Sequence, residues 1–351
     1  MSSYVGTAMT AHTGNRYNSL REQADPIGWA DIECARERIS PWVKKTPLVK
    51  SAALSRLTGA SVYLKLETVH ATGAFKLRGA ANRILELTEK QRERGVVAVS
   101  TGNHGRAVAY IAGRLNIPAT ICMSALVPEN KLKAVRETGA EVRIAGSSQD
   151  EAQQEAERLV KEKGMALIHP FDDPAIIAGQ GTIGAEILED LERVDAVLAG
   201  LSGGGLISGI AVALKSKQPD VRVIGLSPER GPAMYESIKA GKPVVVAEEA
   251  TLADSLGGGI GLDNRYTFEL VSKYVDDYVL LSEVQIAAGM HHLYYHERLV
   301  AEGAAAVGVA ALLADSLRKL RGNIVCVISG NNIDMGEFTR LVACDQKGDR
   351  A

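Results

Sequence analysis

The chain alternates between short apolar runs and longer stretches in which apolar residues recur three or four positions apart. The short runs predict β-strands, and the longer stretches predict amphipathic helices. We expect strands at residues 61–67, 95–100, 119–123, 141–145, 166–169, 195–201, 222–227 and 323–329. We expect helices at residues 31–43, 75–87, 105–115, 129–138, 149–163, 175–191, 206–217, 232–239, 283–300 and 304–320.

Most of these strands are apolar on both faces and are separated by helices, which predicts an α/β fold of parallel strands covered on both sides. The chain leaves one sheet near residue 90 and returns to it near residue 165, so we expect two doubly wound open sheets. The larger domain would comprise residues 31–89 and 165–342, and the smaller one residues 90–164. The remaining ends, residues 1–30 and 343–351, predict flexible tails.

Composition narrows the functional classes. The 351 residues carry a net charge of −2 and only 5% aromatic side chains, which argues against a dedicated nucleic-acid binder. No apolar stretch approaches the roughly 18 residues of a membrane span, and the N-terminus lacks the apolar core of a signal peptide. The four cysteines stand far apart in the sequence. Their spacing predicts neither a zinc site nor a disulfide framework, and it favours a cytoplasmic protein.

Four loops with chemical potential follow predicted strands: STGNHG (100–105), HPFDD (169–173), LSGGGL (201–206) and SGNN (329–332). In α/β folds ligands bind beyond the carboxyl ends of parallel strands, so these loops should converge on one rim. The glycines of LSGGGL would let backbone N–H groups face one anion at a helix N-terminus, and a phosphate is the natural guest. The spacing fits neither a P-loop nor a dinucleotide fingerprint, which points to a smaller cofactor. The alternative is a flexible strand-to-helix turn.

Lys76 and Arg78 fall in the first turn of a predicted helix, where cations oppose the helix macrodipole. The same field, together with burial, lowers the pKa of a lysine and makes its amine a better nucleophile, so Lys76 is a candidate Schiff-base lysine. The alternative is a lysine that faces solvent. STGNHG offers donors for a carboxylate at a helix N-terminus, and the serine of SGNN suits a heterocyclic nitrogen; ordinary capping and turn roles are the alternatives.

Taken together and in order, the segments TGAFKLRGA, STGNHG, IAGQGTIGAEI, SGGGLISG and VISGNN resemble the pyridoxal-phosphate enzymes of fold type II. The branch they resemble contains the serine and threonine dehydratases and serine racemase, and the resemblance runs from about residue 31 to 342. It implies that the larger domain binds pyridoxal 5′-phosphate. It also implies a homodimer that acts on a small-molecule amino acid, with no nucleic-acid or membrane partner.

The resemblance implies a role for each matching residue. Lys76 would form the Schiff base with the cofactor and later take the Cα proton, and Phe75 would stack on the pyridine ring. Asn103 would bind the 3′ oxygen, and Ser329 would face the pyridine nitrogen. The phosphate would lie on Ser202, Gly203, Gly204, Gly205 and Leu206. The substrate carboxylate would lie on Ser100, Thr101, Asn103 and His104.

The implied reaction is removal of water from a 3-hydroxy-2-amino acid, which gives a 2-oxo acid and ammonia. A neutral serine beside the pyridine nitrogen favours such β-elimination over long-lived carbanions. Thr101 stands at the second acid/base position, where racemases carry serine, so we expect little racemisation. The chain ends soon after VISGNN, without room for the regulatory domain of the biosynthetic enzymes, which favours a catabolic role.

Other departures concern the substrate and metals. His70, Asp173 and Ser255 predict a polar lining that suits a substrate with a functional side chain. STGNHGRA and SLGGGIG resemble the dehydratases of hydroxyectoine breakdown, which implies a hydroxylated diaminobutyrate as substrate. Ser227, Gly231 and Ala233 occupy the positions at which racemase relatives bind a divalent cation, so we expect no such metal. Serine racemase, a β-replacement enzyme of the cysteine synthase type and a non-catalytic binding protein stay as alternatives.

Overall fold

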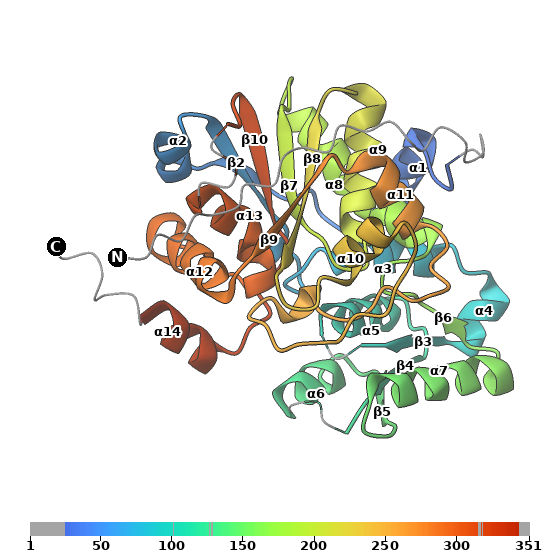
Figure 1. Ribbon diagram of the computed structural model, residues 1–351. Helices are drawn as coiled ribbons and strands as arrows, with labels where there is room; N and C mark the ends of the chain where they lie inside the picture. The colour runs from blue at the N-terminus through green and yellow to red at the C-terminus, as the bar shows by residue number, and fades with distance from the viewer. Residues whose placement is uncertain are drawn as a thin grey trace.

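Two open sheets form the centre of the computed structural model, one above the other in the view of Figure 1. The structure describes residues 25–100, 102–125, 127, 129–314, 317 and 319–343. The two sheets confirm the α/β class and the doubly wound arrangement that the hydrophobic pattern predicts.

The larger sheet has six strands in the order β1-β2-β10-β7-β8-β9. Their bounds are β1 Leu48–Lys50, β2 Ser61–Leu66, β7 Ala196–Gly200, β8 Arg222–Pro228, β9 Asp277–Leu281 and β10 Asn323–Ile328. All neighbours are parallel except β1, which runs antiparallel to β2 at the edge. The central strands β7 and β10 are buried along nearly their whole length, as expected for a sheet covered on both faces.

Helices cover both faces of this sheet. On one face α13 (Gly303–Leu313) contacts β7 and β10 and carries α12 (Glu283–Glu297) on its outer side. On the other face α9 (Gly205–Lys217) contacts β7 and β8 and packs extensively against α8 (Pro174–Asp190). Several glycines lie at this α8–α9 contact. A Cβ added at Gly209 would stand 2.5 Å from the backbone nitrogen of Gly181, so only glycine permits such a close approach.

The smaller sheet has four parallel strands in the order β5-β4-β3-β6. Their bounds are β3 Val96–Val99, β4 Ala119–Met123, β5 Glu141–Ile144 and β6 Ala166–Leu167. Helix α5 (Asn103–Arg114) packs on one face and α7 (Gln149–Lys163) on the other. The remaining helices are α1 Trp29–Ile39, α2 Ala52–Thr58, α3 Lys76–Leu85, α4 Glu89–Arg94, α6 Glu129–Arg136, α10 Ala233–Ala240, α11 Thr267–Tyr274 and α14 Met335–Ala343, with short 3₁₀ turns η1 Glu67–Val69 and η2 Asp254–Leu256.

The domain limits differ in detail from those we expected. Strand β6 pairs with β3, so the smaller sheet continues past residue 165. At the N-terminal side, the expected tail to residue 30 ends earlier, because Asp25 accepts hydrogen bonds from Lys273 and Tyr274 and Ile27 is buried. The first 24 residues and those after 343 lie outside the described residues.

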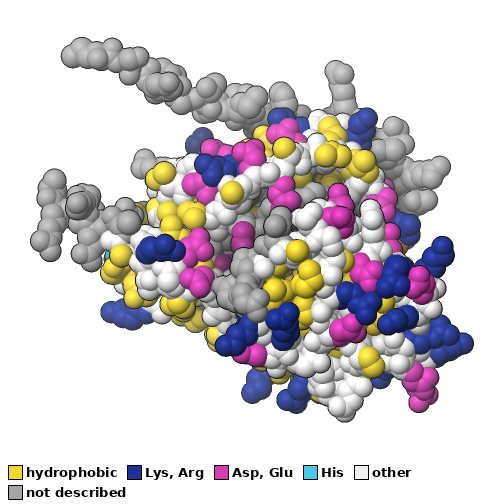
Figure 2. Space-filling view, turned by 90° about the horizontal axis from the view of Figure 1, so that it is seen from below, with side chains coloured by type: hydrophobic (Ala, Val, Ile, Leu, Met, Phe, Trp, Pro, Cys, Tyr) yellow, Lys and Arg dark blue, Asp and Glu magenta, His cyan; other side chains and the backbone are white. Residues whose placement is uncertain are grey.

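The surface around the smaller sheet is mixed in charge. Figure 2 shows lysine and arginine side chains interspersed with aspartate and glutamate, without one large patch of either sign in this view. Helix α4 has no buried residue and lies at the surface. Among the described residues no helix is both long and apolar enough to span a bilayer. Cys34, Cys122 and Cys326 are free thiols, and Cys344 lies outside the described residues.

Candidate active site

The four loops singled out by sequence meet around the start of α3, as their positions after strands predict. The Phe75 N–H donates to the Ser329 carbonyl oxygen at 3.0 Å, and the Asn331 N–H donates to the Gly73 carbonyl oxygen at 2.9 Å. The Asn332 amide donates to Oδ1 of Asn103 at the start of α5. These contacts join the segment before Lys76 to the loops that follow β3 and β10.

Lys76 is the first residue of α3 and is partly buried. Its amine donates to the Pro170 carbonyl oxygen at 2.6 Å and lies 5.3 Å from the centre of the Phe75 ring. Burial lowers the pKa of Lys76 from the ordinary 10.5 to about 8. A substantial fraction of the amine is therefore neutral near physiological pH, which is the form that attacks a carbonyl carbon.

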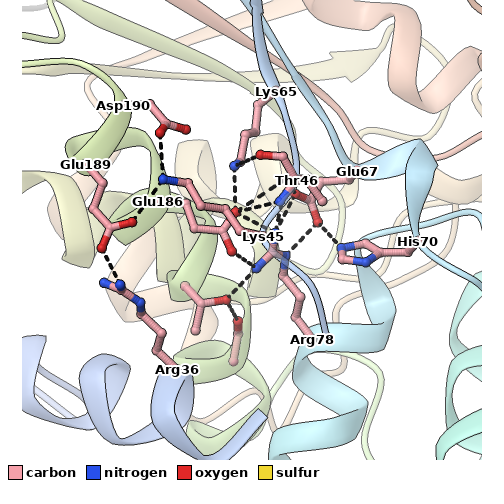
Figure 3. Close-up of polar contacts among 12 residues, drawn as sticks. Arg36, Lys45, Thr46, Lys65, Glu67, His70, Arg78, Glu186, Glu189 and Asp190 are labelled. Atoms are coloured by element: carbon pink, nitrogen blue, oxygen red, sulfur yellow. Dashed lines mark hydrogen bonds and ion pairs between the residues drawn. The ribbon is translucent and has the colours of Figure 1, made fainter. Parts of the chain in front are cut away.

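Arg78, two residues later, lies in a buried cluster of charges (Figure 3). Its guanidinium donates two hydrogen bonds to the Glu67 carboxylate, at 2.7 and 2.9 Å, and two to the Glu186 carboxylate, at 2.6 and 2.8 Å. The Lys65 amine donates to the same Glu186 carboxylate at 2.6 Å, and a His70 ring nitrogen lies 2.9 Å from Glu67. We name Lys65, Glu67, His70, Arg78 and Glu186 the Arg78 cluster.

The Arg78 cluster connects three elements of the larger domain. Glu67 belongs to the turn after β2, Arg78 to α3 and Glu186 to α8. Burial by itself would raise the pKa of Glu67, but the Arg78 guanidinium and His70 outweigh it and hold that pKa far below its ordinary value. Two cations and two carboxylates thus balance inside the protein, and α3 is fixed against both neighbours.

The glycine loop after β7 has the features of an anion cradle. Gly204 has a φ of +89°, and a Cβ at Gly203 would stand 2.3 Å from the Phe171 ring. In the described part of the chain, the N–H groups of Ser202, Gly203 and Gly204 donate to no protein acceptor. They precede the N-terminus of α9, where Leu206 is buried, so the loop suits a phosphate group.

The HPFDD segment ties the neighbouring elements together. The Asp172 carboxylate accepts hydrogen bonds from the backbone N–H groups of Arg265, Tyr266 and Thr267 at the start of α11. Asp173 caps α8 through the N–H of Ala175 at 2.8 Å and forms an ion pair with Arg83. The Asp173 carboxylate, expected to shield substrate, is therefore engaged in a helix cap.

The loop after β3 presents its polar groups at the start of α5. Asn103 is buried, and its amide nitrogen lies 2.8 Å from the Glu302 carboxylate and 3.5 Å from the Ser255 hydroxyl. Ser100 accepts the N–H of Gly102 at 3.2 Å. The remaining member of the expected carboxylate site, Thr101, lies outside the described residues.

His104 has one nitrogen engaged and one without a partner. Its Nε2 atom lies 2.8 Å from the Ile168 carbonyl oxygen, so that nitrogen carries the proton. Its Nδ1 atom is buried without a donor among the described residues. Burial and the nearby Lys76 ammonium lower the pKa of His104 to about 3, which keeps the ring neutral. The side chain therefore cannot donate to a carboxylate as we expected, although its backbone N–H can.

No clear sequence pattern identified some of the residues at this site. Glu302 is 3% exposed and lies at the junction of α13 with the loop after β10, where its N–H donates to the Gly330 carbonyl oxygen at 3.2 Å. Its only signal was a charged residue before a purely apolar helix. Pro170 acts through its carbonyl oxygen, which no side-chain pattern can reveal. His70, expected to line the substrate, contacts Glu67.

The residues present fit pyridoxal phosphate. The cradle at 202–204 offers unpaired N–H groups to a phosphate, and the Lys76 amine has a lowered pKa. The Ser329 side chain is 5% exposed, and its hydroxyl has no hydrogen-bond partner among the described residues, as expected of a group that would face a ring nitrogen. Described residues contain no group of three or more metal-binding side chains.

Comparison with known proteins agrees with this fit. Residues 39–330 match the family described as pyridoxal-phosphate dependent enzyme. The chain is 56% identical over 89% of its length, and 94% of the relative, to a Sinorhizobium fredii protein provisionally named threonine dehydratase. It is 45% identical to the L-threonine ammonia-lyase of Thermotoga maritima, over 89% of this chain and 77% of that protein. It is 40% identical to a catabolic L-threonine dehydratase of Staphylococcus aureus, over 92% and 93%.

Solved structures give the same grouping. Maize serine racemase superposes with a TM-score of 0.85 at 33% identity, over 89% of this chain and 96% of that one. The processed form of tomato (Solanum lycopersicum) threonine deaminase isoform 2 superposes with a TM-score of 0.83 at 34% identity, over 90% and 91%.

Proposed function

Because this chain belongs to the pyridoxal-phosphate-dependent enzymes of fold type II, in the threonine dehydratase family, we propose that it removes water from a 3-hydroxy-2-amino acid in a catabolic reaction. The hydroxyl leaves from Cβ as water after the Cα proton is taken. The enamine formed becomes an imine, and water hydrolyses it to a 2-oxo acid and ammonia. The observation that carries the proposal is the Lys76 amine, with a pKa of about 8, held by the Pro170 carbonyl oxygen, while the next residue, Phe171, packs against the unpaired phosphate cradle.

Lys76 is the proposed link to the cofactor and the base for the Cα proton. Bound pyridoxal phosphate supplies an electron sink for the electrons left at Cα. Pro170 supports the role of Lys76, since its carbonyl oxygen holds the amine at 2.6 Å and orients it. A carbonyl oxygen accepts hydrogen bonds without fixing a charge on the amine, so Lys76 can gain and lose a proton.

We assign cofactor contacts to Phe75, Asn103, Ser329 and the loop from Ser202 to Leu206. Asn103 is supported by its fixed orientation, because Glu302 accepts from its amide nitrogen and Asn332 donates to its oxygen. Thr101 and the N–H groups at the start of α5 are assigned to the substrate carboxylate, since a helix N-terminus favours an anion.

Threonine is the first substrate that we propose, because the relatives at 45% and 40% identity are named for it. A hydroxylated diaminobutyrate is the second. The observation that favours it is a cavity of about 330 Å³ lined by Glu248, Glu249, Ala250, Thr251, Asp254 and Gly257. Ser255 lies between Asp254 and Gly257 in the sequence, and its hydroxyl is 3.5 Å from the Asn103 amide nitrogen. An acidic approach to the site suits a substrate with a second, positive amino group.

The test is a panel of 3-hydroxy-2-amino acids with separate detection of 2-oxo acid and ammonia. Equal amounts of both products from threonine, serine or hydroxylated diaminobutyrate support the proposal. Absence of both products from holoenzyme across the panel would refute it. Comparing kcat/KM for threonine with that for the diamino acid then decides between the two substrates.

Two alternative activities are separated in the same assay. A serine racemase would interconvert enantiomers at a rate that matches 2-oxo acid formation, and chiral chromatography measures this. A β-replacement enzyme would incorporate added sulfide.

We propose that the protein is a cytoplasmic homodimer. The free thiols of Cys34, Cys122 and Cys326 support the compartment and say nothing about the dimer. Size-exclusion chromatography with light scattering tests the oligomeric state.

A further inference from the structure

The imidazole of His104 presents a buried acceptor that no donor of the described residues satisfies. The residue is 4% exposed on the second position of α5, and the Ile168 carbonyl oxygen, 2.8 Å from Nε2, fixes the proton on that nitrogen. Nδ1 is then an unprotonated nitrogen with a lone pair and no donor among the described residues. Leaving a buried acceptor unpaired is costly, so a bound molecule should supply the missing hydrogen.

The surroundings identify what kind of group that hydrogen comes from. Asn103 and His104 begin the helix that we assign to the substrate carboxylate, and Lys76 is near enough to depress the pKa of His104. A carboxylate and a phosphate have only acceptor oxygens and would be repelled by a lone pair. The amino nitrogen of the substrate is used in the bond to the cofactor. The remaining donor that every 3-hydroxy-2-amino acid brings is its hydroxyl.

We propose that His104 Nδ1 accepts a hydrogen bond from the side-chain hydroxyl of the substrate and so selects for hydroxyamino acids. This inference rests on the proposed function and names a specificity-determining residue for it. The hydroxyl oxygen keeps its lone pairs free to take a proton as it leaves, because it acts only as a donor toward His104. A substrate without that O–H leaves Nδ1 unpaired and binds more weakly.

Two substitutions test the roles of the two ring nitrogens of His104 separately. Glutamine at position 104 places its amide where Nε2 stands and can still donate to Ile168, but it lacks the acceptor. Asparagine reaches only as far as Nδ1 and offers its oxygen there, at the cost of the Ile168 bond. His104→Gln should therefore lose the selectivity, and His104→Asn should retain part of it. A purely structural role predicts the reverse order.

Two unreactive ligands measure the selectivity without turnover. α-Methylserine and 2-aminoisobutyrate both lack the Cα hydrogen and differ in a single hydroxyl group. Binding to the holoenzyme is followed by the change in cofactor absorbance. We expect the wild type to bind α-methylserine about ten-fold or more tightly than 2-aminoisobutyrate, and His104→Gln to reduce that ratio to within about two-fold.

Turnover gives a second measure, because β-chloroalanine undergoes the same elimination with a leaving group that has no hydrogen. The ratio of kcat/KM for serine to that for β-chloroalanine should fall about ten-fold or more in His104→Gln and recover in part in His104→Asn.

The outcomes also distinguish this inference from the proposed function. If neither unreactive ligand binds and no elimination occurs, the proposed function fails. If both ligands bind and the His104→Gln substitution weakens them equally, or changes neither, then elimination stands and the role of His104 toward the hydroxyl is wrong.

Discussion

Lys65 on β2 and Lys76 at the start of α3 have opposite surroundings. Lys65 is fully buried, and its amine donates to the Glu186 carboxylate at 2.6 Å and to the Thr46 carbonyl oxygen at 2.8 Å. Lys76 has a carbonyl oxygen as its hydrogen-bond acceptor and forms no ion pair with a carboxylate of the described residues. Lys65 is thus part of a balanced ion cluster, whereas Lys76 is available for chemistry.

The difference shows that burial alone does not make a lysine reactive. Burial lowers the pKa of both residues, but Glu186 opposes the change at Lys65 by stabilising its ammonium form. At Lys76 no carboxylate of the described residues opposes it, and the pKa falls to about 8. The Arg78 cluster holds α3 in place, and Lys76 at the start of α3 has no counter-ion among the described residues.

The largest effect should follow the loss of the available lysine. Lys76→Ala removes both the proposed link to the cofactor and the base for the Cα proton, so 2-oxo acid formation should fall on the order of 10³-fold or more. The cofactor-free variant should remain folded, because Lys76 forms no ion pair with the described residues and burial disfavours its ammonium form. Near-normal turnover by Lys76→Ala would remove the basis of the comparison.

Breaking the Arg78 cluster should instead lower the stability of the fold. Glu67→Gln leaves the Arg78 guanidinium with one carboxylate in a fully buried site, so the free energy of unfolding in urea should fall by about 3–5 kcal/mol. The matched control is Glu189→Gln on α8, whose partners Arg36 and Lys45 are more exposed than Arg78 (Figure 3). That variant should lose less than about 1 kcal/mol. Equal losses in both variants would contradict the contrast.

The lowered pKa of Lys76 predicts a pH profile for cofactor-free protein. The rate at which the protein takes up pyridoxal phosphate should rise about ten-fold per pH unit below pH 8 and level off above it, because the neutral amine reacts. With an ordinary lysine, the rate of uptake would keep rising towards pH 10.5.

Stability should change in the same direction. Between about pH 8 and 10.5 the unfolded chain binds more protons at Lys76 than the folded protein does, so the free energy of unfolding should rise with pH. Lys76→Met should lack that rise, and an unchanged profile in the variant would show that another group is responsible.

The smallest effect should come from metal removal. Ser227, at one of the three positions that the resemblance to racemases implies for a divalent cation, donates its hydroxyl hydrogen to the Leu201 carbonyl oxygen, and Gly231 and Ala233 at the other two have no carboxylate. Mg²⁺ normally needs one or two carboxylates in place of its water. Dialysis against EDTA should therefore change turnover by less than about two-fold. A large loss that Mg²⁺ restores would overturn this expectation.

The sequence predicted the buried strands and the helices between them because their apolar patterns are long and regular. It missed β1, β9, α2, α11 and α14, whose short segments carry mixed patterns. Strand β9 lies at the sheet edge with only one of its residues buried, so no apolar run marks it.

The site was predictable only in part. Lys76 and Arg78 look alike in the sequence, because each is a cation in the first turn of a helix. The structure shows that the two side chains have different surroundings. Arg78 is compensated by Glu67 and Glu186, which are distant in sequence, whereas Lys76 is not compensated. The roles of the Pro170 carbonyl oxygen, the Asp172 cap and Glu302 depend on long-range contacts that a local pattern does not contain.

The most direct test of the account is borohydride reduction of the holoenzyme followed by peptide mapping. Reduction converts a Schiff base between lysine and cofactor into a stable bond, and mass spectrometry then identifies the modified residue. We predict that the pyridoxyl group is found on Lys76 and not on Lys65, and that Lys76→Ala takes up none under the same conditions. A pyridoxyl group on another lysine of the wild type, with Lys76 unmodified, would contradict the account.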